Sequence, residues 1–503
     1  MTRLERGRID RGNGRQWSTS RRSLAGFLLV LVLAAASSSR AEESSLCGPF
    51  EPAAGGSAGS GLRDPGVVPA VFGGVDTKVD VGAIVRLPVP SSDEEDEGGG
   101  AGTEDEAESE AILALPKDGS GSIPTDFELG PGARIARSFF SPVICATVAR
   151  VTGPAGATPT QLVTVVPEGS IVVPNDVYAS AAAELEPVEG MRRSGPDPYA
   201  PLQYGLSVTG VQEARGLGAG DGVKIALLDS APEVDHRDLP ESRIKRLAED
   251  APHETGVHGT LMAGVLSAIE GNGFGIIGLA PDAELVSIPV CRPTGVAGGR
   301  CTIFDLLQGL DRAWESESAI VNLSLSGPPN PLLERGMGRL EELGVVVVAA
   351  AGNEGTGQRR YPAAYPSVVG VGAVDRDGML FERSNRGTWV ELFAPGVEIL
   401  STVPNDAFAF GSGTSLAAAH VTGALAILTG LTHDPLIARA ELFRTAHARR
   451  KSGPMIMPPV CEVLARLGRR CAAEGERSVG PAVRSGHGDP AGHAGPASSS
   501  PAR

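Results

Sequence analysis

Three reactive side chains with complementary chemistry lie far apart along the chain. Asp229 follows the apolar run VKIALL, His258 begins HGTLMAGVL, and Ser415 lies within GSGTSLAAAH. A serine hydroxyl is a weak nucleophile at neutral pH and needs a base within hydrogen-bond reach. A histidine can be that base, and a carboxylate then holds its tautomer and stabilises the imidazolium ion. These residue types predict nucleophilic catalysis in which Ser415 attacks, His258 transfers the proton and Asp229 orients His258.

A fourth residue offers a hydrogen-bond donor for such a reaction. Asn353 lies in VVVVAAAGNEG, in a glycine-flanked turn just after a buried apolar run. A side-chain amide there, together with the backbone N–H of Ser415 at the start of a helix, suits the stabilisation of an oxyanion. We therefore predict that Asn353 holds the oxyanion.

The elements that must position these residues form one long patterned region, from about Pro201 to Thr445. Its apolar runs are short and rich in Val and Ile, as in VKIALLD, AELVSIPV, SAIVNLSL, GVVVVAAA and SVVGVGAV. Such runs are typical of strands buried on both faces of a parallel sheet. Helix-like stretches lie between them, namely HGTLMAGVLSAI, FDLLQGLDRAW and PLLERGMGRLEEL. The alternation predicts an α/β fold with a doubly wound, mostly parallel sheet, whose functional residues gather at the carboxyl ends of the strands.

The same segments resemble the subtilisin-like serine proteases. GTSLAAAHVTG is similar to the nucleophile motif of that family, HGTLMAG to its histidine motif and AAAGNEG to its oxyanion motif. The order Asp, His, Ser is the subtilisin order, with gaps of 29 and 157 residues. The resemblance covers about Pro201 to Gly430. It implies a serine endopeptidase that hydrolyses peptide bonds through an acyl-enzyme and needs no cofactor for the chemistry.

The chain also departs from the family pattern. Ala231 stands where a glycine usually follows the Asp-Ser pair, and Ala419 stands where a proline usually precedes the histidine of the nucleophile motif. The resemblance implies that Ser324, Leu325 and Ser326 form a strand that pairs with the substrate backbone. Glycine is usual at the position of Ser326, whose hydroxymethyl group narrows the specificity pocket. None of these changes removes a catalytic group, but they leave a second interpretation, a catalytically silent exported module that captures extended peptides.

Asp238 and Asn272 are candidate metal ligands. They fall where many members of the family bind a stabilising calcium ion through oxygen ligands. A helix cap and a turn explain both residues equally well.

The first 41 residues have the features of an export signal. A basic region precedes an apolar run from about Leu24 to Ala36, and small residues follow, with cleavage expected after Ala41. The apolar run is shorter than the roughly 20 residues of a membrane-spanning helix, although an uncleaved anchor is the alternative. We expect a mature chain without a transmembrane segment, in the periplasm or outside the cell.

The six cysteines fit an oxidising compartment. Cys291 and Cys301 bracket CRPTGVAGGRC, whose glycines and proline let the chain turn back, so a disulfide is predicted there. The resemblance makes this loop one wall of the substrate groove, and the bond would then stiffen it. Cys461 and Cys471 can pair only if Gly468 ends the helix between them, because an unbroken helix would hold them about 15 Å apart. Free buried thiols are the alternative for all six.

The rest of the chain divides by composition. Residues 42–128 form a Gly-, Pro- and Ser-rich segment with a strongly acidic run and are expected to be disordered, as is the tail at 473–503. Alternating apolar stretches predict a small α+β domain at 129–180, a linker with a possible processing site at 181–200 and the catalytic domain at 201–472.

The resemblance implies that the domain at 129–180 is a prosegment, whose tail occupies the active-site groove and inhibits the enzyme until self-cleavage. An accessory binding domain is the competing interpretation. The net charge of -16 excludes a nucleic-acid footprint, which needs a basic surface. The expected partners are therefore protein or peptide substrates and the chain's own prosegment.

Overall fold

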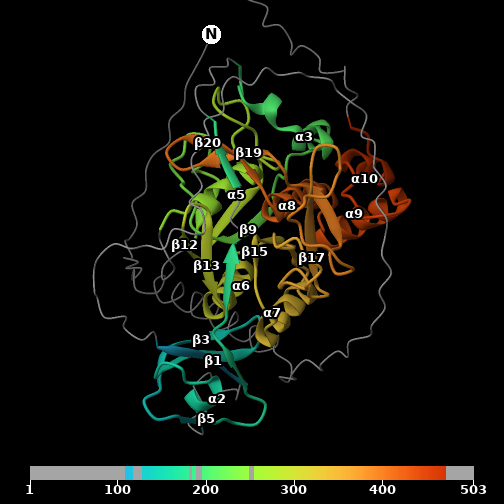
Figure 1. Cartoon of the computed structure of the whole chain (residues 1–503). Helices are drawn as coiled ribbons and strands as arrows, with labels where there is room; N and C mark the ends of the chain where they lie inside the picture. Colours follow the sequence, from blue (N-terminus) through green and yellow to red (C-terminus); the bar gives the residue numbers. More distant parts are fainter. Residues whose placement is uncertain (1–107, 117–126, 181–183, 189–194, 248–253, 472–503) are drawn as a thin grey trace, which may run out of the picture.

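The computed structural model describes residues 108–116, 127–180, 184–188, 195–247 and 254–471. The predicted signal peptide at 1–41, the tail at 473–503 and most of the acidic segment lie outside these residues. The described chain forms a large α/β unit, with a small antiparallel unit packed against one side of it (Figure 1).

A seven-stranded sheet runs through the large unit in the order β10-β11-β9-β14-β16-β17-β18. Each neighbouring pair of strands in it is parallel. The strands are β9 (Lys224–Asp229), β10 (Ile244–Arg246), β11 (Glu284–Pro289), β14 (Ile320–Leu323), β16 (Val346–Ala350), β17 (Val368–Val374) and β18 (Leu392–Pro395). The predicted doubly wound parallel sheet is thus confirmed.

Helices cover both faces of this sheet, which explains the continuous apolar runs. In β9, Ile225 and Leu227 pack into one core cluster with α5 and α8, whereas Ala226 and Leu228 pack into a second cluster with α6 and α7. A strand with both faces buried needs apolar residues at every position. The helices are α3 (Tyr204–Val208), α4 (Val211–Ala214), α5 (Val257–Ser267), α6 (Ile303–Glu315), α7 (Pro331–Glu342), α8 (Thr414–Thr432), α9 (Pro435–Arg449) and α10 (Val460–Arg466), with a short 3-10 turn at Ala200–Leu202.

Helix α8 is the one helix among the described residues that is long and apolar enough to cross a membrane. In this fold 89% of its apolar window is buried inside the molecule. It contacts strands β14, β16, β17 and β18 and helix α5. The apolar character of α8 is therefore accounted for by its place in the core.

The small unit is an antiparallel sheet in the order β3-β4-β1-β6. Its elements are β1 (Ser109–Pro116), β2 (Glu128–Leu129), β3 (Arg134–Ser141), β4 (Ala146–Gly153), α2 (Pro159–Leu162), β5 (Val163–Val165) and β6 (Ile171–Pro174). Strand β1 lies within the segment 42–128, so the expected disorder is wrong for residues 109–116. The run AILAL is short and follows many acidic residues, but alternate side chains of β1 are buried on opposite faces of the sheet, which makes it a central strand.

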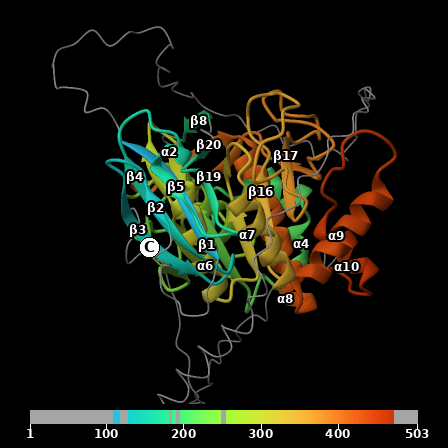
Figure 2. The same cartoon turned by 90° about the horizontal axis from the view of Figure 1, so that it is seen from below.

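The small unit lies against helices α6 and α7 (Figure 2). The Asp311 carboxylate on α6 accepts hydrogen bonds from Ser141 Oγ (2.8 Å) and from the Val143 N–H (3.1 Å). On the same surface, the rings of Phe139 and Phe304 meet edge to face with centroids 5.2 Å apart. Buried polar and aromatic contacts thus join the two units.

Two further small sheets join strands of the large unit to the segment that follows the small unit. One has the order β12-β13-β7-β15 and the other β19-β20-β8. Their strands are β7 (Val177–Ser180), β8 (Glu184–Pro187), β12 (Cys291–Thr294), β13 (Gly298–Thr302), β15 (Leu325–Ser326), β19 (Ile399–Val403) and β20 (Ala407–Ser412). In each sheet a strand from the segment between the units pairs with strands of the large unit.

Both disulfides considered from the sequence are present. Cys291 and Cys301 face each other across the β12–β13 hairpin and are bonded. Cys461 and Cys471 are also bonded, because α10 ends at Arg466 and Gly468 then takes φ +75°. Cys145 is disulfide-bonded as well, and Cys47 lies outside the described residues.

Candidate active site

Asp229 is the last residue of β9, at the carboxyl end of the central sheet. Its side chain is 1% exposed, and its Oδ1 accepts the Ser230 N–H at 2.7 Å. The hydroxyl of Ser230 accepts the Gly259 N–H at 3.0 Å, which ties the start of α5 to the end of β9. The carboxylate is thus fixed beside the helix that carries His258.

His258 is the second residue of α5 and is buried. Its Nδ1 lies 2.8 Å from Asp229 Oδ2 and 2.9 Å from Asp229 Oδ1. A carboxylate only accepts hydrogen bonds, so Nδ1 carries the proton, and Nε2 of the neutral ring is left as an acceptor. Nε2 is buried and has no hydrogen-bond partner among the described residues. The ring is therefore held with a free basic nitrogen facing away from Asp229.

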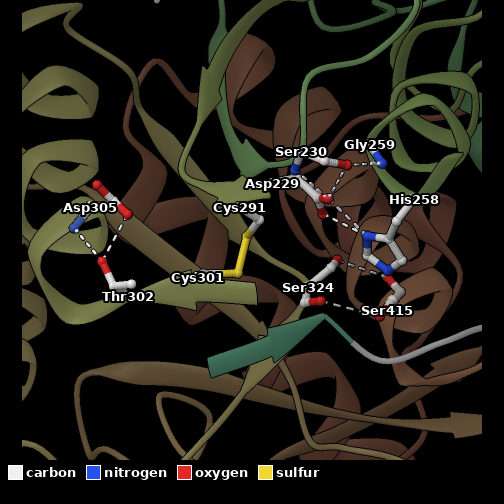
Figure 3. Close-up of a disulfide and its surroundings, with 10 residues drawn as sticks. All are labelled: Asp229, Ser230, His258, Gly259, Cys291, Cys301, Thr302, Asp305, Ser324 and Ser415. Atoms are coloured by element: carbon white, nitrogen blue, oxygen red, sulfur yellow. Dashed lines mark hydrogen bonds and ion pairs between the residues drawn. A yellow bond between two sulfur atoms is a disulfide. The ribbon is translucent and has the colours of Figure 1, made fainter. Parts of the chain in front are cut away.

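Ser415 is the second residue of α8 and is fully buried. In Figure 3 its side chain lies beside the edge of the His258 ring that is turned away from Asp229. The Ser415 hydroxyl donates to the Ser324 carbonyl at 3.4 Å, and Ser324 Oγ donates to the Ser415 carbonyl at 3.4 Å. Catalytic hydrogen bonds often tighten only when substrate binds. Among the described residues Ser415 Oγ makes no hydrogen bond to His258 Nε2, and a contact between these two atoms would complete the chain of hydrogen bonds.

Asn353 follows β16 in a turn whose residue Gly352 has φ +97°. Its Oδ1 accepts from the Thr414 N–H (2.9 Å) and from Thr414 Oγ1 (3.0 Å), which fixes the orientation of the amide. Nδ2 therefore faces the other way, is buried, and has no partner among the described residues. A Cβ on Gly413 would lie 3.0 Å from this Nδ2, so the close approach depends on glycine. The arrangement leaves an oriented, unused donor beside Gly413, two residues before Ser415.

Of the three residues predicted to form the substrate strand, Leu325 and Ser326 form β15, whereas Ser324 lies just before it, and the segment Val177–Ser180 (β7) pairs with this strand. In β15, Leu325 pairs with Ser180 and Ser326 pairs with Ala179 of β7. On its other edge β7 pairs antiparallel with β13, as in the pair of Tyr178 and Cys301. The walls formed by β13 and β15 therefore hold an extended segment between them.

Sequence reasoning did not identify the pocket that holds Tyr178. This side chain is 0% exposed, and its hydroxyl donates to the Pro328 carbonyl at 2.5 Å. A Cβ on Gly327 would come within 2.5 Å of the ring, so the missing side chain of Gly327 makes room for it. The only sequence signal was a lone aromatic residue near the end of the small domain.

Strand β8 pairs with β20, the strand that leads to Ser415. Glu184 of β8 pairs with Ser412, which lies three residues before Ser415. Strand β7 thus pairs with β15, just after Ser324, and β8 pairs with β20, just before Ser415, whereas residues 181–183 lie outside the described residues.

The structure brings Asp238 and Asn272 together. Asp238 Oδ1 accepts from Asn272 Nδ2 (2.8 Å) and Oδ2 from the Ile276 N–H (2.8 Å), while Asn272 Oδ1 accepts from the Phe274 N–H (2.7 Å). Burial raises the pKa of Asp238 to about 7. The described residues contain no group of three or more His, Cys, Asp or Glu side chains suited to a metal. The two side chains offer oxygen ligands of the kind calcium takes, but these oxygens already accept hydrogen bonds.

Comparisons with known proteins agree with this geometry. The model of the family described as "Subtilase family" matches residues 220–453. The major intracellular serine protease of Bacillus subtilis (strain 168) is 38% identical over 260 residues, which are 48% of this chain and 80% of that protein. Subtilisin Savinase of Lederbergia lenta is 38% identical over 220 residues, covering 42% of this chain and 78% of that protein. The chain therefore belongs to the subtilase family of serine endopeptidases.

Among solved structures, the prenylagaramide maturation protease PagA matches 51% of this chain and 98% of its own chain. The TM-score is 0.46 and the sequence identity is 24%.

Proposed function

We propose that the chain is an exported serine endopeptidase in which Asp229, His258 and Ser415 form the catalytic triad. The observation that carries the proposal is the buried Nε2 of His258, which lacks a partner while Asp229 holds the other nitrogen at 2.8 Å. Ser415 Oγ attacks the carbonyl carbon of the scissile bond, and its proton passes to Nε2. The imidazolium ion, stabilised by Asp229, then protonates the leaving amine. Water, deprotonated by Nε2, hydrolyses the acyl-enzyme and restores Ser415.

Asn353 would stabilise the negative oxygen of the tetrahedral intermediate. Its Nδ2 is turned away from Thr414 and needs a partner, as does the backbone N–H of Ser415 in the first turn of α8. A developing oxyanion would satisfy both donors. Such preorganised donors act mainly in the transition state.

The prosegment would act as an intramolecular inhibitor. This proposal is supported by β7, which lies between β13 and β15 where an extended substrate would bind. Because β7 ends at Ser180 and β8 begins at Glu184, the bond cleaved in self-processing would lie between these two residues. The competing interpretation, an accessory binding domain, does not require a strand in this groove.

Export is supported by the disulfides at Cys291–Cys301 and Cys461–Cys471, which are typical of oxidising compartments. The signal peptide at 1–41 remains part of this proposal. A structural calcium ion held by Asp238 and Asn272 is likewise proposed. The ion would take the place of the N–H groups that now donate hydrogen bonds to the side-chain oxygens of these residues.

Hydrolysis of casein by the purified chain tests the proposal, with Ser415→Ala as the inactive variant and Ser207→Ala as a matched loss of a hydroxyl in α3. We expect casein cleavage by the wild-type chain and by Ser207→Ala, and none by Ser415→Ala. Mass spectrometry of the N-terminus should show a new end between Ser180 and Glu184 only in the active chains. A well-folded wild-type chain that leaves casein intact would favour the silent peptide-binding module.

A further inference from the structure

The two residues before β7 are held by the ends of two helices of the large unit. The Ile303 N–H donates to the Asp176 carbonyl (3.0 Å), and the Phe304 N–H donates to Asn175 Oδ1 (3.1 Å). Ile303 and Phe304 begin α6, so these N–H groups have no acceptor within their own helix. The groove therefore continues past β7 to the start of α6.

The start of α7 contributes a side chain to the same stretch. Asn330 caps α7, with its Oδ1 accepting the Leu332 N–H (3.1 Å) and the Leu333 N–H (3.4 Å). The amide nitrogen is therefore turned outward, and it donates to Asp176 Oδ2 at 3.3 Å. The Tyr365 hydroxyl accepts the Asn330 N–H (2.8 Å) and donates to the Asn330 carbonyl (2.9 Å). These hydrogen bonds all lie within the large unit, so they orient the Asn330 donor independently of the segment that binds there.

The spacing of the bound residues allows two side chains to be recognised together. Along an extended segment alternate side chains point to the same side. Asp176 meets Asn330, Val177 is 39% exposed, and Tyr178 fills its pocket. The groove thus contacts the side chains at two positions that are separated by one exposed residue.

We infer that Asn330 forms a subsite for an acidic side chain, two residues before the residue that enters the Tyr178 pocket. The inference rests on the proposed function, since it assumes that substrates bind as β7 does. It defines a substrate class of extended peptides with Asp, one residue of any type and then Tyr on the amino-terminal side of the cleaved bond. Asn330 is a specificity-determining residue in this account.

Asn330→Asp is the informative variant. Asp and Asn cap helices about equally well, so α7 keeps its cap. The group facing Asp176 changes from a donor to a carboxylate oxygen, which repels an acid and attracts a base. The preferred charge at this position should therefore reverse.

A double-mutant cycle on the full chain tests the contact without using activity. All variants carry Ser415→Ala, so the prosegment stays attached. We expect Asp176→Lys to lower the melting temperature by about 1–3 °C when residue 330 is Asn, and to raise it when residue 330 is Asp. Val177→Lys introduces the same charge at the exposed neighbouring position and should show no coupling to residue 330. Additive effects of Asp176→Lys and Asn330→Asp would overturn the inference.

Quenched peptides with the sequence of residues 175–184 extend the test to substrates. The processed enzyme should cleave the Asp176 peptide with a kcat/KM about 5- to 10-fold above that of the peptide with Lys there. The Asn330→Asp enzyme should have the higher kcat/KM for the Lys peptide. Replacing Val177 of the peptide by Lys should leave kcat/KM unchanged for both enzymes. Equal values within twofold for the Asp and Lys peptides would overturn the substrate preference. If the wild-type enzyme cleaves none of the peptides, the proposed function fails, and the cycle alone decides the Asn330 contact.

Discussion

Two buried polar atoms of the proposed catalytic residues have no hydrogen-bond partner among the described residues. They are Nε2 of His258 and Nδ2 of Asn353. A buried polar group without a hydrogen bond costs about 1–3 kcal/mol, so each of these two atoms calls for a partner. In the proposed reaction both atoms find partners, the first in the Ser415 proton and the second in the oxyanion. Their lack of partners in the folded chain is therefore consistent with function.

Removing the Asn353 donor should slow catalysis without unfolding the chain. Asn353→Asp keeps an oxygen for the Thr414 N–H and hydroxyl but removes the donor, and Asn353→Ala removes both. We expect kcat to fall by about 10²–10³ in Asn353→Ala, and at least as far in Asn353→Asp because a negative charge would face the oxyanion. Steady-state peptide hydrolysis measures this. A kcat within fivefold of wild type for Asn353→Asp would show that Asn353 does not stabilise the oxyanion.

The sequence indicated the reactive residues but not all of their contacts. Motif spacing predicted that Asp229, His258, Ser415 and Asn353 would lie close together at one edge of the sheet. It could not predict that the Ser415 hydroxyl bonds to Ser324, because that depends on side-chain rotation after folding. The roles of all four residues stay predictions until variants are measured.

The hairpin of β12 and β13 forms one wall of the groove, and Cys291–Cys301 closes it. We expect Cys291→Ser with Cys301→Ser to lower stability by about 3 kcal/mol and to raise KM, because β13 pairs with the bound segment. The pair Cys461→Ser with Cys471→Ser is the control, since it should lower the melting temperature without raising KM. An unchanged melting temperature and KM in the first variant would show that the bond does not stiffen the groove.

Helix α6 carries a carboxyl group that should make prosegment binding depend on pH. Burial against the small unit raises the pKa of Asp311 to about 8, and its Oδ2 has no partner among the described residues. Once the prosegment leaves, solvent should return this pKa toward the usual range near 4. Prosegment binding is then strongest at pH values below the ordinary pKa of an aspartate. The contribution of Asp311 to binding is lost as the pH rises through about 8.

Gel filtration of the processed enzyme at pH 6 and pH 9 measures this effect. We expect the cleaved prosegment to remain bound at pH 6 and to be released at pH 9. Asp311→Asn keeps an acceptor for Ser141 and Val143 but cannot ionise. The variant enzyme should therefore retain the cleaved prosegment to nearly the same extent at both pH values. A wild-type chain that retains the prosegment equally at both pH values contradicts the assignment.

At the level of elements, the sequence predicted the central sheet better than the small unit. Strands buried on both faces, such as β16 and β17, leave long runs of Val and Ile that periodicity detects. Strand β1 was missed because its apolar run follows the acidic segment. Packing against neighbouring strands makes this run a strand, and a short sequence window does not contain those neighbours.

For the whole molecule, the proposed calcium ion gives a stability prediction. Without the ion, the pKa of Asp238 is raised to about 7, so its contribution to stability is lost as the pH rises through that value. Calcium favours the ionised carboxylate and should stabilise the chain more at pH 8 than at pH 6. Thermal melting of the Ser415→Ala chain in calcium and in EDTA measures the shift, with Asp238→Asn as the variant that should reduce it. Identical melting temperatures at pH 8 would rule out a stabilising ion at Asp238.

The two units together suggest an order of events for the whole chain. The small unit covers α6 and α7, β7 fills the groove, and β8 leads away beside β20 (Figures 1 and 2). The path of β7 through the groove could not be predicted from composition, since pairing between distant segments leaves no local pattern. The proposed order is folding, self-cleavage between Ser180 and Glu184, and release of the prosegment.

Labelling with an active-site fluorophosphonate tests the central claim most directly, with the modified residue identified by mass spectrometry. The processed wild-type enzyme should carry one adduct, on Ser415, because only a hydroxyl activated by a neighbouring base reacts readily. The adduct should vanish in Ser415→Ala and form much more slowly in His258→Ala, while Ser207→Ala should label normally. A folded, processed wild-type protein that gives no adduct, or gives it on another residue, would contradict the account.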